Sequence, residues 1–142
     1  MNGSCQCGSV KFTTPTTQPI RLYCCHCLHC QKQSTSAFGT SAIFPAFSLP
    51  KDAPVGLWVN KKTDSGKAMN CYFCKNCGSR IMHDRGIGTV SVKGGLLDGL
   101  DWNDGIHIWT KRAVVPIPQG AVTHEGQPPS NENKKPLHQA NY

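Results

Sequence analysis

Short apolar or alternating segments, each ended by glycine, proline or a cysteine cluster, follow one another along most of the chain. Ser9–Thr13 alternates between polar and apolar residues, and Ile20–Cys24 is an apolar run, as is typical of strands that bury one or both faces. Leu28–Ser34 is the one segment that we predict as a helical turn. Further strands are predicted at Phe38–Phe44, Val55–Val59, Ala68–Phe73, Arg80–His83, Thr89–Lys93 and Ile106–Trp109. The pattern predicts an all-β domain of several small sheets, of a size that commonly needs metal for stability.

The chain of 142 residues suits one compact domain. Apolar anchors become sparse after Pro118, so we expect the segment from Gln119 onward to be mobile or to lie loosely on the surface. No apolar run of about 18 residues is present, which predicts that there is no transmembrane helix. The first residues lack the basic and apolar regions of a signal peptide, so we expect a cytoplasmic protein with no membrane partner.

Nine cysteines change this picture, because in a reducing compartment metal ligation is a better explanation for them than disulfides. The odd number points the same way. The formal net charge of +7 falls to about +4 if seven of the cysteines are thiolates bound to two zinc ions. The basic residues are scattered along the sequence rather than interleaved with aromatic residues, so we expect no nucleic-acid partner.

A C-x₂-C pair, Cys74 and Cys77, gives the strongest local signal. Two thiolates at this spacing can bind one tetrahedral ion if the backbone turns sharply, and Gly78 permits such a turn. Cys5 and Cys7 can point the same way from one strand or tight turn and complete a four-cysteine site. A full tetrahedral shell leaves no place for substrate, so we interpret this site as structural.

A second group, formed by Cys25, Cys27 and Cys30, places three sulfurs within six residues of sequence. Three protein ligands with an open fourth position are the arrangement expected of a catalytic zinc. The open position could accept water, hydroxide or a substrate thiolate. The sequence therefore predicts a reactive centre here and two zinc ions per chain.

Other residues could close this second shell and leave it without chemistry. Cys24 or Cys71 could complete a second four-cysteine site, and His26 or His29 could also supply the fourth ligand. Cys24 adjoins Cys25 on a predicted strand and should point to the opposite face, which favours a buried thiol. A buried, small apolar role is favoured for Cys71, and a surface or packing role for both histidines.

Three motifs occur in an order that resembles one known family. They are G-x-C-x-C-G at Gly3–Gly8, C-H-C-x₂-C at Cys25–Cys30 and F-C-x₂-C-G-S at Phe73–Ser79. Further matching segments are Ser36–Gly39, Gly66-Lys67, Gly95–Asp98, His107–Trp109 and Glu125-Gly126. The chain is thus similar to the glutathione-dependent formaldehyde-activating enzyme family, which includes centromere protein V. The resemblance runs from Gly3 to about Pro128, which gives a domain at 1–128 and a flexible tail at 129–142.

The resemblance implies the family's β-tent fold of small coiled antiparallel sheets. It implies a carbon–sulfur lyase that forms or cleaves S-hydroxymethylglutathione, with glutathione as co-substrate and a small-molecule thiol and an aldehyde as partners. It also places seven cysteines on the family's zinc ligands, structural at Cys5, Cys7, Cys74 and Cys77 and catalytic at Cys25, Cys27 and Cys30.

The chemistry needs a thiolate, because the protonated thiol does not attack carbonyls, and a zinc-bound sulfur is held in the thiolate form. Proton transfer could be carried out by His26, His29 or His83. Substrate carboxylates could be met by Arg80, Arg85 or Lys67, although each is as readily a surface charge.

Two positions depart from the family pattern. Thr35 stands where a glycine is usual, and Ala113 leads into Val114 where a tryptophan is often seen. We expect both positions near the substrate cleft, so another thiol adduct or metabolite is an alternative substrate. A non-catalytic zinc module with a binding role, as in centromere protein V, is an alternative of a different class.

Overall fold

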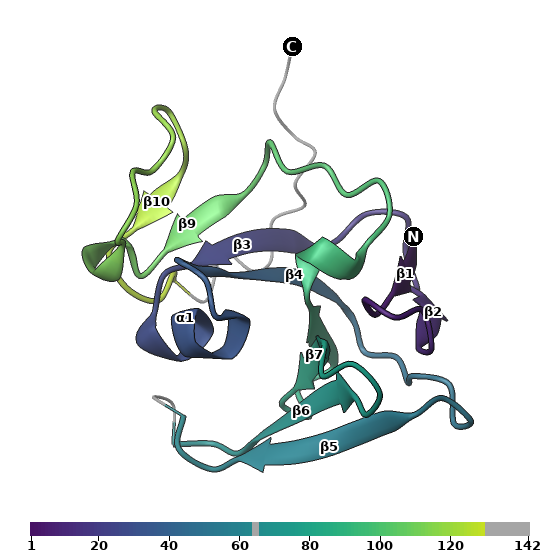
Figure 1. Cartoon of the computed structure of the whole chain (residues 1–142). Coiled ribbons are helices and arrows are strands. Elements are labelled where there is room, and N and C mark those ends of the chain that lie inside the picture. Colours follow the sequence, from purple (N-terminus) through teal and green to yellow (C-terminus); the bar gives the residue numbers. More distant parts are fainter. Residues whose placement is uncertain (64–65, 130–142) are drawn as a thin grey trace.

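The computed structural model describes residues 1–63 and 66–129 (Figure 1). Its strands are β1 (Asn2–Ser4), β2 (Lys11–Thr13), β3 (Arg21–Cys25), β4 (Gly39–Pro45), β5 (Val55–Asn60), β6 (Met69–Cys74), β7 (Arg80–Asp84), β8 (Thr89–Val92), β9 (Ile106–Ile108) and β10 (Thr123–His124). The helical elements are α1 (Leu28–Ser34), η1 (Gly94–Leu96) and η2 (Thr110–Arg112). The all-β class predicted from the pattern is confirmed. No helix in the described ranges is both long and apolar enough to cross a membrane.

The strands are divided between a hairpin and one large sheet. β1 pairs with β2, and the other eight strands are hydrogen-bonded in the order β10-β9-β3-β4-β8-β7-β6-β5. Most neighbours are antiparallel, but β9 lies parallel to both β3 and β10. These parallel pairs join segments that are far apart in sequence, so the end of the described chain is tied to the strand that leads into the second cysteine group.

The polar and apolar pattern identifies most of these elements. Each predicted strand overlaps an observed one, with ends shifted by at most two residues, and the predicted helical turn is α1. The pattern does not predict β1 or β10, because strands of three and two residues are too short to show an alternation. β10 lies in the segment after Gln119 that we expected to be mobile, and it pairs there with β9. The predicted tail at 129–142 lies outside the described residues except for residue 129.

The central strands have one face on the core and the other on a cavity. Leu22 of β3, Phe44 of β4 and Val92 of β8 are almost fully buried in the main apolar cluster. Because side chains alternate along a strand, Ser41 and Ile43 of β4 point the other way and line the cavity. The alternation that builds the core therefore also aims the end of β3 at the cavity.

The large sheet bends, so that its two ends face each other. In Figure 1 the β5–β6–β7 end lies beneath the β3–β4 end, and α1 lies beside the space between them. Residues of β3, α1, β4, β5, β6, β7 and β8 all line a single cavity of about 980 Å³. The bend thus brings strands from distant places in the sheet order to one hollow.

Candidate metal centres

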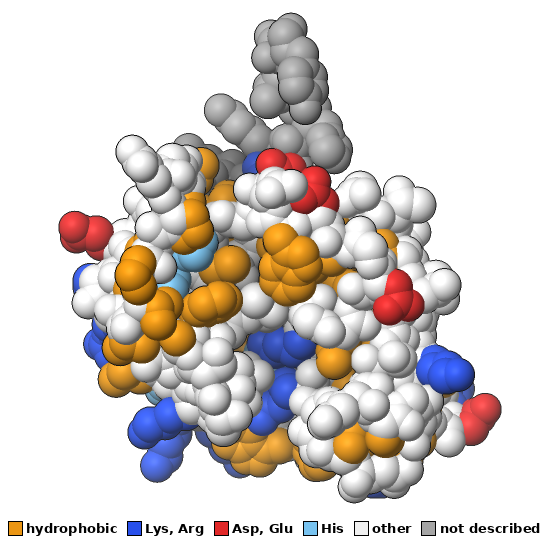
Figure 2. All heavy atoms as spheres, turned by 45° about the horizontal axis from the view of Figure 1, so that its top comes forward, with side chains coloured by type: hydrophobic (Ala, Val, Ile, Leu, Met, Phe, Trp, Pro, Cys, Tyr) orange, Lys and Arg blue, Asp and Glu red, His pale blue; other side chains and the backbone are white. Residues whose placement is uncertain are grey.

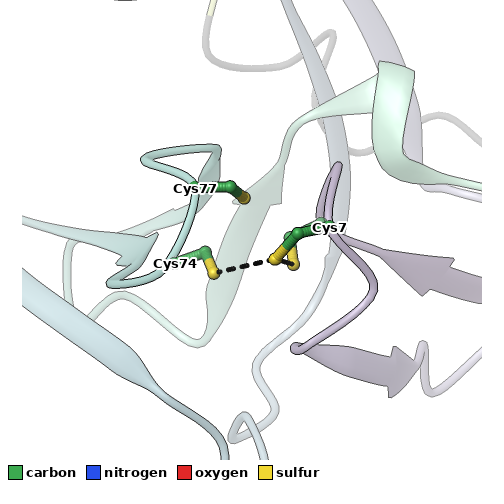
Figure 3. A group of neighbouring side chains, drawn as sticks. Cys7, Cys74 and Cys77 are labelled. Carbon is green, nitrogen blue, oxygen red and sulfur yellow. Dashed lines mark hydrogen bonds between the residues drawn. The ribbon is translucent and has the colours of Figure 1, made fainter.

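The first cysteine group joins the β1–β2 hairpin to the turn between β6 and β7. The Sγ atoms of Cys5, Cys7, Cys74 and Cys77 all lie within 4.8 Å of one another. Figure 3 shows the sulfurs of Cys7, Cys74 and Cys77 facing one another from the two turns. The Sγ atom of Cys7 is 3.5 Å from that of Cys5 and 3.8 Å from that of Cys74. The structure therefore brings together the four residues that we predicted as structural ligands.

The two turns use the same local geometry. The Gly8 N–H donates to the Cys5 carbonyl, and the Gly78 N–H donates to the Cys74 carbonyl, both at 2.9 Å. Both glycines have a φ of 75°, a left-handed conformation that side chains other than glycine rarely adopt. Each cysteine pair thus folds its backbone around the position where an ion would lie, and the glycine after each pair makes this possible.

The sulfur distances fit a zinc ion and do not fit disulfides. Sulfurs bound at ~2.3 Å to the corners of a tetrahedron lie ~3.8 Å apart, whereas disulfide sulfurs are only ~2.0 Å apart. All nine cysteines are free thiols in the structure. The Ser79 hydroxyl, together with backbone N–H groups, lowers the pKa of Cys77 to about 5, which favours the thiolate that a metal needs. Four thiolates would fill the shell of such an ion.

The second group is assembled where β3 meets α1. The Sγ atoms of Cys25, Cys27 and Cys30 lie within 4.8 Å of one another and line the cavity. Cys25 ends β3, Cys27 is the N-cap of α1, and Cys30 lies one turn later, so that its N–H donates to Cys27 Sγ at 3.4 Å. Hydrogen bonds from the thiols of Cys25 and Cys30 lower the pKa of Cys27 to about 2. Three sulfurs, one of them readily ionised, fit three corners of a zinc tetrahedron.

The residues that could have closed this shell lie elsewhere. Among residues 1–63 and 66–129, no fourth cysteine, histidine or carboxylate joins the trio within the same distance. Cys24 is buried next to Gly105, on the opposite side of β3 from Cys25. Cys71 is fully buried, with its Sγ 3.6 Å from the Met69 carbonyl oxygen.

The two neighbouring histidines also take the roles that we favoured. His26 is fully buried, and its Nε2 lies 2.9 Å from Nδ1 of His107. Burial and the nearby His107 lower the pKa of His26. His29 is exposed on α1 and lines the cavity. His26 is therefore a packing residue, and His29 is a surface residue at the rim of the cavity.

The cavity beside the second group is lined by cations. Apolar walls are provided by residues such as Ile43, Trp58 and Trp109. Figure 2 shows lysine and arginine side chains inside a hollow of the surface. Within the described part of the chain, no aspartate or glutamate lines the cavity. The cations of its lining are Arg21, Lys32, Lys61, Lys62, Arg80, Arg85 and Lys93.

Three of these polar residues form a cluster in which a histidine lies between two cations. Arg80 Nη1 lies 3.0 Å from Nε2 of His83, and Lys93 Nζ lies 3.4 Å from Nδ1 of the same ring. Burial, together with Lys93 and Arg80, lowers the pKa of His83 to about 2. The ring is therefore neutral near pH 7.

The structure places the other predicted contact residues differently. Arg80 and Arg85 line the cavity as expected, whereas Lys67 does not. Sequence reasoning missed Lys93, which looked like the polar end of a strand. Its signal was the alternation of β8, because Lys93 continues the face of Thr89 and Ser91, and that face lines the cavity.

The two departures from the family pattern do not lie at the cavity. Thr35 is the C-cap of α1 with a φ of 50°, a left-handed conformation in which glycine is usual. Val114 is 68% exposed, and neither residue is part of the cavity lining. The expectation that both positions are near a substrate cleft is therefore wrong for the cavity described here.

Comparison with known proteins gives one match. The sequence model of the family described as glutathione-dependent formaldehyde-activating enzyme matches residues 1–112. No curated protein matches the chain. The matched range contains both cysteine groups and every cation of the cavity lining.

Proposed function

Because the chain belongs to the glutathione-dependent formaldehyde-activating enzyme family, we propose that it is a zinc-dependent carbon–sulfur lyase that forms or cleaves adducts between a thiol and an aldehyde. The observation that supports this most directly is the contrast between the two cysteine groups. The first has four sulfurs, whereas the second has three and opens into a cavity. An enclosed set suits a structural ion, and an incomplete set beside a cavity suits a reactive one.

Zinc fits both donor sets, and the two sites would do different work. At the first, Cys5, Cys7, Cys74 and Cys77 would hold an ion that ties the hairpin to the large sheet. At the second, an ion held by Cys25, Cys27 and Cys30 would keep a substrate thiol ionised beside the aldehyde.

The residues of the cavity would bind and orient the substrates. Its lining cations suit a thiol that carries carboxylates, such as glutathione, because acidic groups can pair with them. The apolar walls would exclude water from the reacting carbon. Holding both reactants in one hollow replaces an encounter in solution with a reaction between neighbours.

Of the three histidines that we considered for proton transfer, His26 does not line the cavity, whereas His29 and His83 do. A ring with the low pKa of His83 does not take up a proton near neutral pH. We therefore assign His83 to positioning Arg80 and Lys93, which it contacts through its two ring nitrogens.

The test measures adduct formation and metal content together. Purified protein is loaded with zinc and mixed with glutathione and formaldehyde, and the exchange between free and hydroxymethylated glutathione is followed by NMR. We expect exchange faster than the uncatalysed reaction, two zinc ions per chain, and loss of the acceleration when a chelator removes the more accessible ion. Two bound zinc ions with no acceleration for any thiol and aldehyde pair would instead support a non-catalytic zinc module.

A further inference from the structure

The cations of the cavity occur at two depths. Lys61, Lys62 and Arg85 are exposed at its rim, where they can meet distant acidic groups of a long substrate. Lys93 is only 7% exposed, and Arg80 is half-buried. Only a small group that enters the cavity can reach the deeper pair.

The deeper pair lacks a matching set of acceptors. Arg80 and Lys93 each approach one nitrogen of His83, at 3.0 and 3.4 Å. A neutral imidazole has one acceptor nitrogen, so it cannot accept from both cations at once. With no acidic residue in the described lining, the buried ammonium of Lys93 has an unmet need for an anion, since burying an unpaired charge is costly.

Lys93 is also close to the reacting centre. Burial lowers the pKa of Lys93 to about 8, and the thiolates of Cys30 and Cys25 oppose this effect. Their influence indicates that the ammonium and the second sulfur group face the same part of the cavity. An anion between Lys93 and Arg80 would therefore lie next to the carbon that a substrate thiol attacks.

We propose that Arg80 and Lys93 bind a carboxylate carried by the aldehyde, so that the preferred electrophile is a small aldehyde acid rather than neutral formaldehyde. This inference rests on the proposed lyase function. A planar carboxylate can accept from the guanidinium and the ammonium together, which satisfies both cations, while His83 stays between them as a positioning residue. Formaldehyde offers no charge to either cation.

The reaction is an addition that balances without a further reactant. The sulfur of the thiol forms a bond to the aldehyde carbon, and the π pair of the carbonyl becomes a lone pair on its oxygen. That oxygen takes the proton that the thiol gave up, which yields a 2-hydroxy-2-thio acid. Cleavage is the same sequence in reverse, and nothing is oxidised or reduced.

The first experiment compares two electrophiles of similar size in the zinc-loaded protein. Glyoxylate carries a carboxylate next to the aldehyde, and glycolaldehyde carries a neutral hydroxymethyl group there. With 2-mercaptoethanol as an uncharged thiol, we expect a higher kcat/KM for glyoxylate. In Lys93→Met and Arg80→Gln this value should fall at least about tenfold, as loss of a charged hydrogen bond implies, with less than about a twofold change for glycolaldehyde. Lys75→Met, an exposed cation outside the cavity lining, is the matched control and should match the wild type.

The second experiment measures binding without turnover. Calorimetric titration with glycolate, an unreactive hydroxy acid, should give a Kd at least about tenfold weaker in both variants than in the wild type and in Lys75→Met. Zinc content and thermal unfolding are measured for every protein. If Lys93→Met loses metal or does not fold, Arg80→Gln decides the outcome.

The results separate this inference from the proposed function. No acceleration with any aldehyde would overturn the lyase, whereas acceleration that is equal for glyoxylate and glycolaldehyde would overturn only the carboxylate site. A uniform loss with both electrophiles in Lys93→Met would mean that the lysine merely balances the charge of the thiolates. A dependence on Lys93 that appears with 3-mercaptopropionate but not with 2-mercaptoethanol would mean that the carboxylate belongs to the thiol. Either result would contradict the inference.

Discussion

At the level of single residues, Cys27 links the start of a helix to the second sulfur group. Its extended backbone allows it to cap α1, and its Sγ accepts from the N–H of Cys30 while lying within 4.8 Å of two other sulfurs. The sulfur is part-exposed, whereas the main apolar core lies on the other face of the central strands. A change of this atom should therefore affect the metal more than the fold.

Cys27→Ser is expected to lower the zinc content by about one ion per chain and to remove lyase activity, because a hydroxyl does not replace a thiolate ligand. Metal quantification and circular dichroism measure the two effects. Cys24→Ser, which changes a buried thiol outside both sulfur groups, is the control and should keep both ions. A Cys27→Ser protein that retains two ions and full activity would contradict the assignment.

His83 makes a prediction about the dependence of stability on pH. Burial, Lys93 and Arg80 lower its pKa from 6.5 to about 2 in the folded protein, so below pH 6.5 the unfolded chain binds a proton that the folded chain does not. The free energy of unfolding therefore falls as the pH decreases through 6.5, by on the order of 1 kcal/mol between pH 7.5 and 5.5.

His83→Gln should remove most of this loss, and denaturant unfolding at the two pH values measures it. His29→Gln, which changes an exposed histidine at the rim, is the control and should behave like the wild type. Zinc content is checked at both pH values, because protonation of thiolates also releases metal. Equal pH dependence in all three proteins would show that His83 does not carry the effect.

At the level of elements, the second sulfur group depends on how closely α1 approaches β4. Gly39 begins β4, and a Cβ atom there would lie 3.0 Å from Cβ and 3.5 Å from Sγ of Cys30. The Cβ of Cys30 is fixed to the helix backbone and cannot rotate away. A larger residue at Gly39 must therefore push the helix, and with it the sulfur.

Gly39→Ala is expected to weaken zinc binding at the second group by about tenfold or more, as changes next to a metal ligand commonly do. Competition with a chromophoric chelator measures the affinity of each site. Gly95→Ala, at a glycine with open space around it and an ordinary φ, is the control. Unchanged affinity in Gly39→Ala would show that the helix can move without displacing Cys30.

The turn between β6 and β7 predicts the opposite balance of effects. Its two cysteines share the first sulfur group with the β1–β2 hairpin, so an ion there holds two sheets together. Cys77→Ser should lower the free energy of unfolding by more than about 4 kcal/mol or make the protein insoluble, because a structural metal contributes directly to folding. Lys75→Met, an exposed change in the same turn, should have little effect. A stable Cys77→Ser protein with an unchanged unfolding midpoint would contradict the structural assignment.

At the level of the whole molecule, the positive charge is concentrated around a hollow rather than on a flat face. Seven of the chain's 15 lysines and arginines line the cavity. Two bound zinc ions and seven thiolates would leave a net charge of about +4. The arrangement favours small acidic ligands over the backbone of a nucleic acid, which needs cations spread along an accessible surface.

We therefore predict no specific DNA binding, with a Kd no tighter than ~10⁻⁴ M at physiological salt. Fluorescence anisotropy of a labelled duplex over a range of salt concentrations measures this. Glyoxylate or glutathione added as a competitor shows whether any residual binding uses the cavity. A steep linear decrease of log K with log salt from a submicromolar Kd would support a nucleic-acid module instead.

Local patterns in the sequence predicted the strands and the metal-binding groups because both depend on nearby residues. The spacing of Cys74 and Cys77 alone limits how the backbone can turn. The cluster of Arg80, His83 and Lys93 could not be predicted in this way, because it depends on how β7 pairs with β8, where His83 lies opposite Ser91. The parallel pairing of β9 likewise depends on contacts between distant segments, which no local alternation encodes.

The first sulfur group also sets an order of events during synthesis. Residues 5 and 7 leave the ribosome well before residues 74 and 77, by roughly 4–14 s at ordinary rates of translation. Throughout that interval the nascent chain presents half of a binding site, with two thiols open to oxidation. The hairpin can be locked in place only after more than half of the polypeptide has been made, so the supply of zinc at that moment governs how much newly made protein matures.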